Sequence, residues 1–263
     1  MSGHRAKKRF GQHFLRDRRV VERIMRAFNP QPADTVVEIG PGQGVLTQEL
    51  VGRVGRLHVI ELDRDLVAHL RHRFSPDILT VHGVDALRFE FGRLAPPGTR
   101  LRVIGNLPYN ISTPLLFHLL GQIDIVQDML FMLQKEVVDR IAAQPGSADY
   151  GRLSVMIQWR LRVEKLFEVG PGAFSPPPRV DSAVVRLAPH ATAPIDVTDP
   201  ERFSRIVQAA FAQRRKTLRN NLKGAVDAAE MQRIDIDPNR RAGTLTLEEF
   251  ARLARCPPPV GAT

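Results

Sequence analysis

The sequence has few of the residues that mark several classes of protein. Its 263 residues include one cysteine, Cys256, which excludes an internal disulfide and a zinc site made of several cysteines and fits a reducing compartment. No run of about 18 apolar residues is present, so we expect no membrane span. No apolar stretch follows the basic start, so we expect no secretory signal. We therefore expect a cytoplasmic protein with neither a bound metal nor a membrane partner.

Positive charge is what the sequence has in excess. It contains 38 Lys and Arg against 28 Asp and Glu, a net charge of +10. Residues 1–26 hold nine basic residues against two acids, and residues 201–223 hold seven against one. Because nucleic acids are extended polyanions, this uneven charge favours a nucleic-acid partner.

Short β-rich runs alternate with helical stretches along most of the chain. The runs are TVVEIG, RLHVIEL, ILTVHG, RLRVIGNLP, DMLFMLQ, RVEKLFEVG and SAVVRLAP. This alternation predicts an α/β fold with a doubly wound, Rossmann-like sheet of seven strands and helices on both faces. The last two runs have little helix between them, which predicts an antiparallel edge.

A change in composition predicts a domain boundary. Residues 188–200 are rich in Pro, Thr and Ala and have no hydrophobic periodicity, as in a linker. We expect residues 1–187 to form the cofactor-binding domain with a basic N-terminal arm. Residues 201–263 have helical spacing and predict a small helical domain.

A glycine-rich loop joins the first run to the next helical stretch. Gly40, Gly42 and Gly44 let the backbone pass close to a ligand and point N–H groups at a phosphate or carboxylate. Glu61 ends the second run, where a carboxylate can accept hydrogen bonds from two ribose hydroxyls. These residues alone indicate NAD or S-adenosyl-L-methionine, and a tight strand-to-helix turn is the other use of the glycines.

Asp85 and Ala86 follow the third run. A carboxylate there can accept from the amino group of adenine while apolar neighbours cover the ring, although an isolated Asp also serves as a helix cap. Ligands of doubly wound sheets bind along the carboxyl ends of the strands. The recurrence of glycine or polar residues at successive strand ends therefore favours a cofactor site.

The fourth run ends in Asn106-Leu107-Pro108-Tyr109. An exocyclic amine on a nucleobase is a poor nucleophile, because its lone pair is delocalised into the ring. If the Asn106 side-chain oxygen and the Pro108 carbonyl each accept one amine hydrogen, the lone pair can point at an activated methyl group. Tyr109 offers a face on which the base can stack. An ordinary turn is the alternative interpretation of this tetrapeptide.

Together these residues resemble the KsgA-type ribosomal RNA adenine dimethyltransferases. Seven motifs in order carry the resemblance: KKRFGQHFLRD, VEIGPGQGVLT, VIELD, GVDAL, NLPYNIS, GAFSPPPRVDSAVVRL and AFAQRRKTLRNNL. The resemblance implies a methyltransferase sheet that binds S-adenosyl-L-methionine. It implies transfer of methyl groups to N6 of two adjacent adenosines near the 3′ end of 16S rRNA, within an immature 30S particle. We expect the chain to act as a monomer with a linked role in small-subunit biogenesis.

The resemblance also implies roles for particular residues. Cofactor positions fall on His13, Leu15, Gly40, Glu61, Asp85 and Asn106. His13 departs from the Asn that this family commonly has there, although an imidazole can still donate or accept a hydrogen bond. Phe174 is expected to sandwich the target adenine against Tyr109, unless it is an ordinary core residue.

Basic residues in two segments are expected to contact RNA phosphates. They are Arg5, Lys7, Lys8 and Arg9 in an arm that orders on RNA, and Arg214, Arg215, Lys216 and Arg219 on little more than one helical turn. A solvated basic helix face is the alternative for the second group.

Three other functions fit parts of the pattern. A large-subunit (23S) rRNA adenine methyltransferase of the antibiotic-resistance type would share the sheet and the reactive tetrapeptide. A nicotinamide-dependent dehydrogenase would use the glycine loop and Glu61, but it would leave residues 106–109 without a role. A non-catalytic ribosome-assembly factor would use only the basic faces.

Overall fold

The computed structural model describes residues 12–257, which form two compact units. The first unit comprises the described residues up to Val138 together with Arg162–Pro189. The second comprises Asp139–Leu161 and the described residues from His190 onward. The expected linker at residues 188–200 contains the last of these boundaries, but residues 139–161 group with the C-terminal helices instead of with the first domain.

Packing explains why residues 139–161 belong to the second unit. Trp159 of α6 (Arg152–Arg160) packs on Phe203 of α7 (Pro200–Ala210), with ring centroids 4.7 Å apart. The Gly146 N–H donates to the Gly243 carbonyl at 2.7 Å. Composition marks a linker, but it does not reveal that an earlier segment returns to the later domain. The unit is completed by α8 (Leu218–Asn221), α9 (Ala228–Arg233), η6 (Ala242–Thr244) and α10 (Leu247–Arg255).

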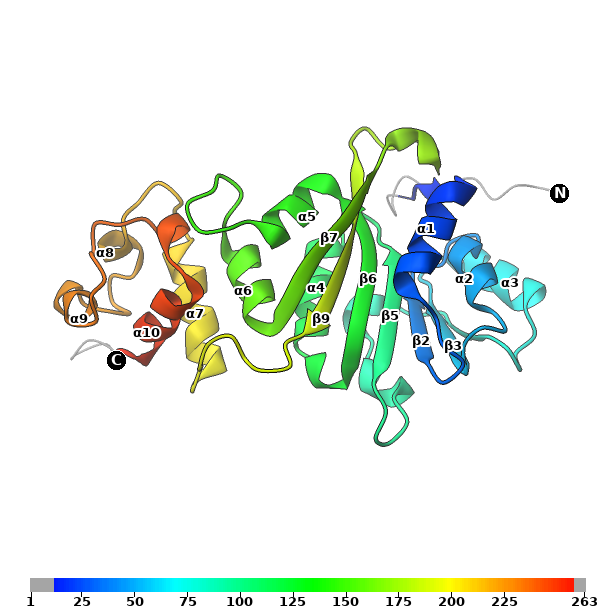
Figure 1. Cartoon of the computed structure of the whole chain (residues 1–263), viewed down its shortest axis with the longest axis horizontal. Coiled ribbons are helices and arrows are strands. Elements are labelled where there is room, and N and C mark those ends of the chain that lie inside the picture. The colour runs from blue at the N-terminus through cyan, green and yellow to red at the C-terminus, as the bar shows by residue number, and fades with distance from the viewer. Residues whose placement is uncertain (1–11, 258–263) are drawn as a thin grey trace. The chain divides into compact units, whose positions relative to one another are not determined.

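The first unit contains a seven-stranded sheet in the order β4-β3-β2-β5-β6-β9-β7 (Figure 1). Its strands are β2 (Thr35–Ile39), β3 (Arg56–Ile60), β4 (Thr80–His82), β5 (Leu101–Asn106), β6 (Val126–Gln134), β7 (Leu161–Val169) and β9 (Ser182–Pro189). Neighbouring strands from β4 to β6 are parallel, whereas β9 runs antiparallel to β6. The predicted doubly wound sheet and the antiparallel strand near its edge are therefore confirmed.

Helices lie on both faces of this sheet (Figure 1). One face carries α1 (Arg18–Phe28), α2 (Val45–Leu50) and α3 (Arg64–Arg73), and the other carries α4 (Ser112–Leu120) with the short helices η2 (Ala86–Arg88), η3 (Phe91–Leu94) and η4 (Ile123–Ile125). α5 (Lys135–Ala142) follows β6. A small second sheet pairs β1 (Phe14–Leu15) antiparallel to β8 (Phe174–Ser175), which follows η5 (Pro171–Ala173).

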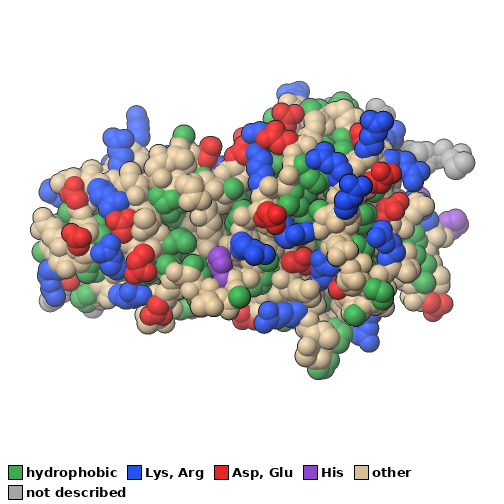
Figure 2. Space-filling model, in the orientation of Figure 1, with side chains coloured by type: hydrophobic (Ala, Val, Ile, Leu, Met, Phe, Trp, Pro, Cys, Tyr) green, Lys and Arg blue, Asp and Glu red, His purple; other side chains and the backbone are tan. Residues whose placement is uncertain are grey.

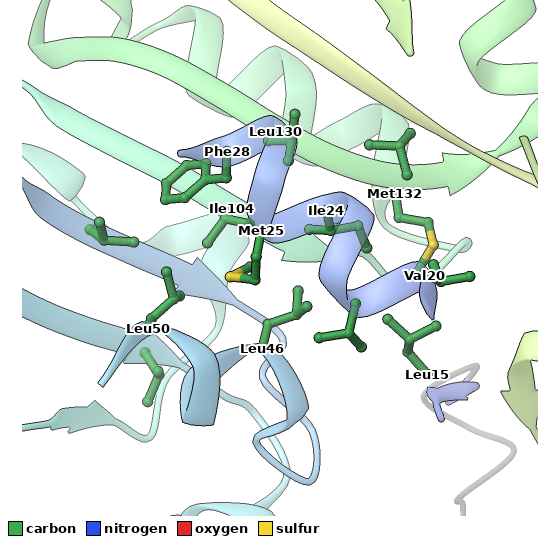
Figure 3. Packing of buried hydrophobic residues seen from close by; sticks show 14 of the residues in the cluster. Leu15, Val20, Ile24, Met25, Phe28, Leu46, Leu50, Ile104, Leu130 and Met132 are labelled. Atoms are coloured by element: carbon green, nitrogen blue, oxygen red, sulfur yellow. The ribbon is translucent and has the colours of Figure 1, made fainter. Parts of the chain in front are cut away.

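The core beneath α1 is built from residues at helical spacing. Val20, Ile24, Met25 and Phe28 point from one face of α1 onto Ile104, Leu130 and Met132 of the sheet and Leu46 and Leu50 of α2 (Figure 3). Asp17 caps the helix by accepting from the Arg19 N–H at 2.8 Å. Among residues 12–257, no helix has the length and apolar character required to cross a bilayer.

Arg102 on β5 joins three parts of the first unit. Its guanidinium binds Asp128 through two bonds of 2.7 and 2.9 Å and Asp34 through one of 2.7 Å. It also donates to the carbonyls of Phe28 and Asn29, at 2.7 and 3.1 Å. All five N–H groups of this buried cation are therefore used, which joins the end of α1 to the sheet.

Arg102→Met should destabilise the fold by about 3–5 kcal/mol, because it leaves two partly buried carboxylates without their cation. Urea denaturation followed by circular dichroism measures the change. Arg100→Met, an exposed neighbour, is the matched control and should stay within about 0.5 kcal/mol of the wild type. Equal stability of the two variants would contradict this role for Arg102.

Candidate active site

A pocket lies at the carboxyl ends of the parallel strands β2 to β5, closed on one side by β1. Residues predicted from the sequence to bind the cofactor or the target base line it together: His13, Leu15, Gly40, Gly42, Glu61, Asp85, Ala86, Asn106, Pro108 and Tyr109. Gly44, Phe174 and the basic residues of 214–219 do not line it. One site therefore contains residues from five chain segments.

The glycine loop requires backbone conformations that other residues rarely adopt. Gly40, Gly42 and Gly44 have φ of 67°, 57° and 80°. We call residues 13–15, which comprise His13 and β1, the lid of the pocket. A side chain at Gly42 would begin 3.0 Å from the Phe14 ring, so glycine lets the lid approach the loop. Gly44 has a different role, because a Cβ there would lie 3.1 Å from Leu70 of α3. It permits helix packing behind the loop and does not line the pocket.

The two predicted carboxylates are held by backbone donors. Glu61 accepts from the Gly42 N–H at 3.3 Å and from the Asp63 N–H at 2.9 Å. Burial raises the pKa of its carboxyl, partly offset by these hydrogen bonds. One oxygen of Asp85 accepts from the Leu87 N–H at 2.9 Å and so caps η2. In the described chain its other oxygen has no partner, so the capping and ligand-binding interpretations are compatible.

Two apolar residues next to these acids line the pocket, although we did not predict from the sequence that they would. Leu62 follows Glu61 and Val84 precedes Asp85; both line the pocket, yet they are 52% and 39% exposed. Large apolar groups that border a pocket next to carboxylates suit a flat ring with a polar edge, such as adenine. The sequence could have indicated this role for Leu62 and Val84, because each is adjacent to a predicted ligand-binding acid at the end of a strand.

Asn106 is oriented by the lid. Its side-chain N–H donates to the His13 carbonyl at 3.0 Å, which leaves the side-chain oxygen without a partner in the described chain. The His13 ring stacks on Tyr109, with centroids 5.6 Å apart at an angle of 28°, and its Nδ1 lies 2.8 Å from the Pro176 carbonyl oxygen. His13 therefore contacts both Asn106 and Tyr109 at the end of β5 and Pro176 in the segment after β8.

Tyr109 is held at both ends. The hydroxyl forms a 2.7 Å hydrogen bond with the hydroxyl of Ser182, a buried residue at the start of β9. Burial raises the pKa of the Tyr109 phenol, so the hydroxyl is neutral at physiological pH. The ring is therefore a fixed wall of the pocket.

The carbonyl oxygen of Pro108, which we expected to accept an amine hydrogen, already accepts two hydrogen bonds within the protein. It accepts from the Ile111 N–H at 3.2 Å and from the Ser112 hydroxyl at 3.0 Å, which uses both of its lone pairs. The start of α4 thus competes for the oxygen that was predicted to accept an amine hydrogen. In the described chain the Leu107 carbonyl has no such partner, and Leu107 also lines the pocket.

Phe174 lies in the core and not on the pocket wall. It is 5% exposed, pairs with Leu15 across β1 and β8, and belongs to the cluster under α1. The alternative interpretation as a core phenylalanine describes this structure better than the predicted adenine sandwich. Strand pairing of β8 turns the ring inward, and the sequence did not reveal that pairing.

In the predicted basic cluster of the second unit, Arg214, Arg215 and Lys216 lie in the turn between α7 and α8, and Arg219 lies in α8, so the four do not share one helical turn. Arg214 donates to the carbonyls of Ala148 and Tyr150 and so has a structural role in its own unit. Arg215, Lys216 and Arg219 are exposed. Lys7, Lys8 and Arg9, with Arg5, lie outside the described residues.

Glu38 at the base of the pocket was also missed. It is buried on β2 and accepts a 2.6 Å hydrogen bond from the Thr47 hydroxyl. Burial raises its pKa to about 8, lowered somewhat by Thr47 and raised by nearby Glu61. Within residues 12–257, no cluster of three or more His, Cys, Asp or Glu is placed to hold a metal.

Comparisons with known proteins show which family and which solved structures the chain resembles. The family model described as ribosomal RNA adenine dimethylase matches residues 3–256. Ribosomal RNA small subunit methyltransferase A of Nitrosococcus oceani is 58% identical over 254 residues, 96% of each chain. The protein of the same name in Pseudomonas aeruginosa is 54% identical over 252 residues, which cover 95% of this chain and 94% of that one.

Two solved structures share the fold over nearly the whole chain. A dimethyladenosine transferase from Plasmodium falciparum has a TM-score of 0.78 and 25% identity, covering 92% of this chain and 96% of that one. The 23S rRNA methyltransferase ErmE has a TM-score of 0.69 and 26% identity, covering 92% and 98%.

Replacement of Glu38 by Gln should reduce the dependence of stability on pH. From pH 4.5 to about 8 the folded chain keeps a proton on Glu38 that the unfolded chain loses, so the free energy of unfolding falls as pH rises. The variant should lose about 1 kcal/mol less per pH unit in this window. Denaturation at several pH values measures the slope, with exposed Glu22→Gln as the control that keeps it. An unchanged slope in Glu38→Gln would contradict a buried, protonated carboxyl.

Proposed function

We propose, from the premise that the chain belongs to the ribosomal RNA adenine dimethylase family, that it dimethylates N6 of two adjacent adenosines near the 3′ end of small-subunit 16S rRNA. The relatives named small subunit methyltransferase A, at 52–58% identity over nearly the full length, support the small-subunit substrate. The observation that carries the proposal is the meeting of Asn106 and Tyr109 with Gly40, Glu61 and Asp85 in one pocket.

The pocket residues fit S-adenosyl-L-methionine, which supplies a methyl group already activated on a sulfonium. Glu61 and Asp85 line the pocket. Glu61 would accept from ribose hydroxyls, and Asp85 would accept from the adenine amino group. Leu62 and Val84 provide apolar surface for the ring. The positive-φ loop at Gly40 and Gly42 lets the backbone approach the amino-acid end of the cofactor.

Asn106 prepares the target amine for attack. Its amide is oriented by the His13 carbonyl, so its oxygen is the atom available to accept one amine hydrogen. The Leu107 carbonyl is the second acceptor we propose, because the Pro108 carbonyl already receives two donors from the start of α4. In the first transfer, with both hydrogens held, the amine lone pair would leave conjugation and become free to attack the methyl group. In the second transfer the amine has one hydrogen left, so one acceptor would hold it. Alignment and electrostatics, rather than a strong base, provide the rate.

Tyr109 binds the flipped base by stacking. Its hydroxyl bond to Ser182 fixes the ring, and stacking contributes about 1–3 kcal/mol per base. The His13 ring already covers one face of Tyr109, so the base uses the opposite face or displaces the imidazole.

The other functions have less support. ErmE shares the fold at 26% identity, but the relatives above 50% identity carry the small-subunit name. A dehydrogenase gives no role to Asn106 and Tyr109. Assembly-factor activity is compatible with catalysis, and we propose that the monomeric enzyme binds an immature 30S particle in the cytoplasm, without a membrane.

The deciding assay incubates the protein with labelled S-adenosyl-L-methionine and undermethylated small or large ribosomal subunits. Digestion should yield N6,N6-dimethyladenosine from the small subunit, and primer extension should stop at two adjacent adenosines near the 3′ end of 16S rRNA. Label in 23S rRNA alone would overturn the proposed substrate.

Asn106→Ala should reduce transfer in that assay by at least about 100-fold, because one acceptor of the amine is lost. Calorimetry should still detect cofactor binding. Exposed Asn239→Ala is the matched control and should methylate like the wild type. A folded Asn106→Ala protein with normal transfer would remove the role assigned to this amide.

Tyr109→Phe should keep kcat/KM for the RNA substrate within about tenfold of the wild type, because it keeps the ring and loses one hydrogen bond. Tyr109→Ala should lose more, up to about 150-fold, because the stacking surface disappears. Steady-state kinetics with small subunits compares the two. If Phe is as damaging as Ala, the hydroxyl and not the ring carries the function.

A further inference from the structure

The outward face of α1 carries arginines that the pocket does not use. Arg19, Arg23 and Arg26 follow one another at spacings of four and three residues, which places them in one stripe along the helix. This stripe is opposite the apolar face that packs into the core, and all three side chains are exposed. We call these three residues the α1 arginine stripe. Figure 2 shows Lys and Arg side chains gathered over the part of the first unit where Figure 1 draws α1.

Folding makes little use of these charges. None of the three arginines forms an ion pair within residues 12–257, whereas Arg102 on the sheet uses all of its donors. Arg23 lies over the Phe167 ring at 3.9 Å, a contact that still leaves its N–H groups free for a ligand. Arg19 is in the first turn of α1, at the end of the helix dipole that disfavours cations, and the acid at this end, Asp17, accepts from the Arg19 backbone N–H and not from its guanidinium.

The stripe begins beside the pocket. α1 starts three residues after β1, and Phe14 and Leu15 of β1 line the pocket. The Arg16 N–H bonds the Ala173 carbonyl at 2.8 Å, which fixes the connection between the lid and the helix. From Arg19 to Arg26 the helix rises about 10 Å, comparable with the rise of about three nucleotides in a duplex strand. A strand whose base enters the pocket can therefore continue along the helix.

We propose that the α1 arginine stripe binds the phosphates of the rRNA that flanks the target adenosines. The inference rests on the proposed function and adds a second RNA surface, on the same unit as the pocket. Guanidinium groups match phosphate oxygens with two parallel hydrogen bonds, and repeated exposed arginines suit a repeating anion. The target base must leave its stack before transfer, and this requires protein contacts to the RNA backbone beside the flipped nucleotide. The stripe provides these contacts.

The test replaces all three arginines, in one Arg19→Gln, Arg23→Gln and Arg26→Gln variant. Gln keeps the helix propensity, and the pocket residues are untouched. The matched control is Arg53→Gln, Arg56→Gln and Arg100→Gln, three exposed arginines at the opposite, amino-terminal edge of the strands. Both variants remove the same charge, so the comparison isolates position from net charge.

Binding to undermethylated small subunits is measured over a salt series, together with KM, kcat and calorimetric cofactor affinity. The stripe variant should lose about two to three units from the slope of log K against log salt, while the control keeps its slope within about one unit. KM for the subunit should rise at least about tenfold, and cofactor affinity should stay unchanged.

Equal slopes and equal KM values for the two triple variants would overturn this inference while leaving the proposed function intact. Failure of the wild type to methylate small subunits would instead overturn the proposed function itself. A loss of cofactor affinity in the stripe variant would also contradict the inference, because it would assign the effect to the lid and the pocket and not to RNA binding.

Discussion

Parallel pairing of β2, β3, β4 and β5 is the constraint on which the site depends. The ladder continues past the strand ends, since the Gly40 N–H bonds the Ile60 carbonyl and the Glu61 N–H bonds the His82 carbonyl. The loops that follow these strands therefore begin side by side, at the same edge of the sheet. At Gly105 the approach is especially close, because an added Cβ would lie 2.5 Å from the Ile39 carbonyl oxygen. The site is thus positioned by backbone hydrogen bonds before any side chain contributes.

The parts of the site that the sequence predicted share this origin. Gly40, Glu61 and Asp85 each follow a β-rich run, and the carboxyl ends of parallel strands meet at one edge of the sheet. The parallel direction of the strands follows from the alternation of runs and helices, so a doubly wound sheet of seven strands was predictable, whereas the order of its strands was not. The positive φ of Gly40 and Gly42 was foreseeable too, because glycines at a tight strand-to-helix turn commonly take that conformation.

Features that depend on contacts between distant segments were not predictable in this way. Phe174 turns inward because β8 pairs with β1, a contact across about 160 residues of sequence that no local pattern records. Arg214 is exposed, yet it donates to the carbonyls of Ala148 and Tyr150, so a residue predicted to bind phosphate also joins two segments of its own unit. The Pro108 carbonyl accepts two donors from the start of α4, and Glu38 appeared to be one more strand residue. A periodic sequence pattern indicates which side of a helix or strand is buried, but it does not indicate which distant segment packs against that side.

The lid is joined to the rest of its unit by a very short ladder. β1 and β8 pair through two residues each, supported by the bond from Arg16 to Ala173 and by the contacts of His13. A ladder of this length can open locally without disturbing the main sheet, because few hydrogen bonds are broken. Each dimethylated adenosine consumes two methyl donors, so spent cofactor must leave between transfers. Opening of this ladder would also separate the Asn106 side-chain amide from the His13 carbonyl, so each exchange of cofactor resets the orientation of that amide.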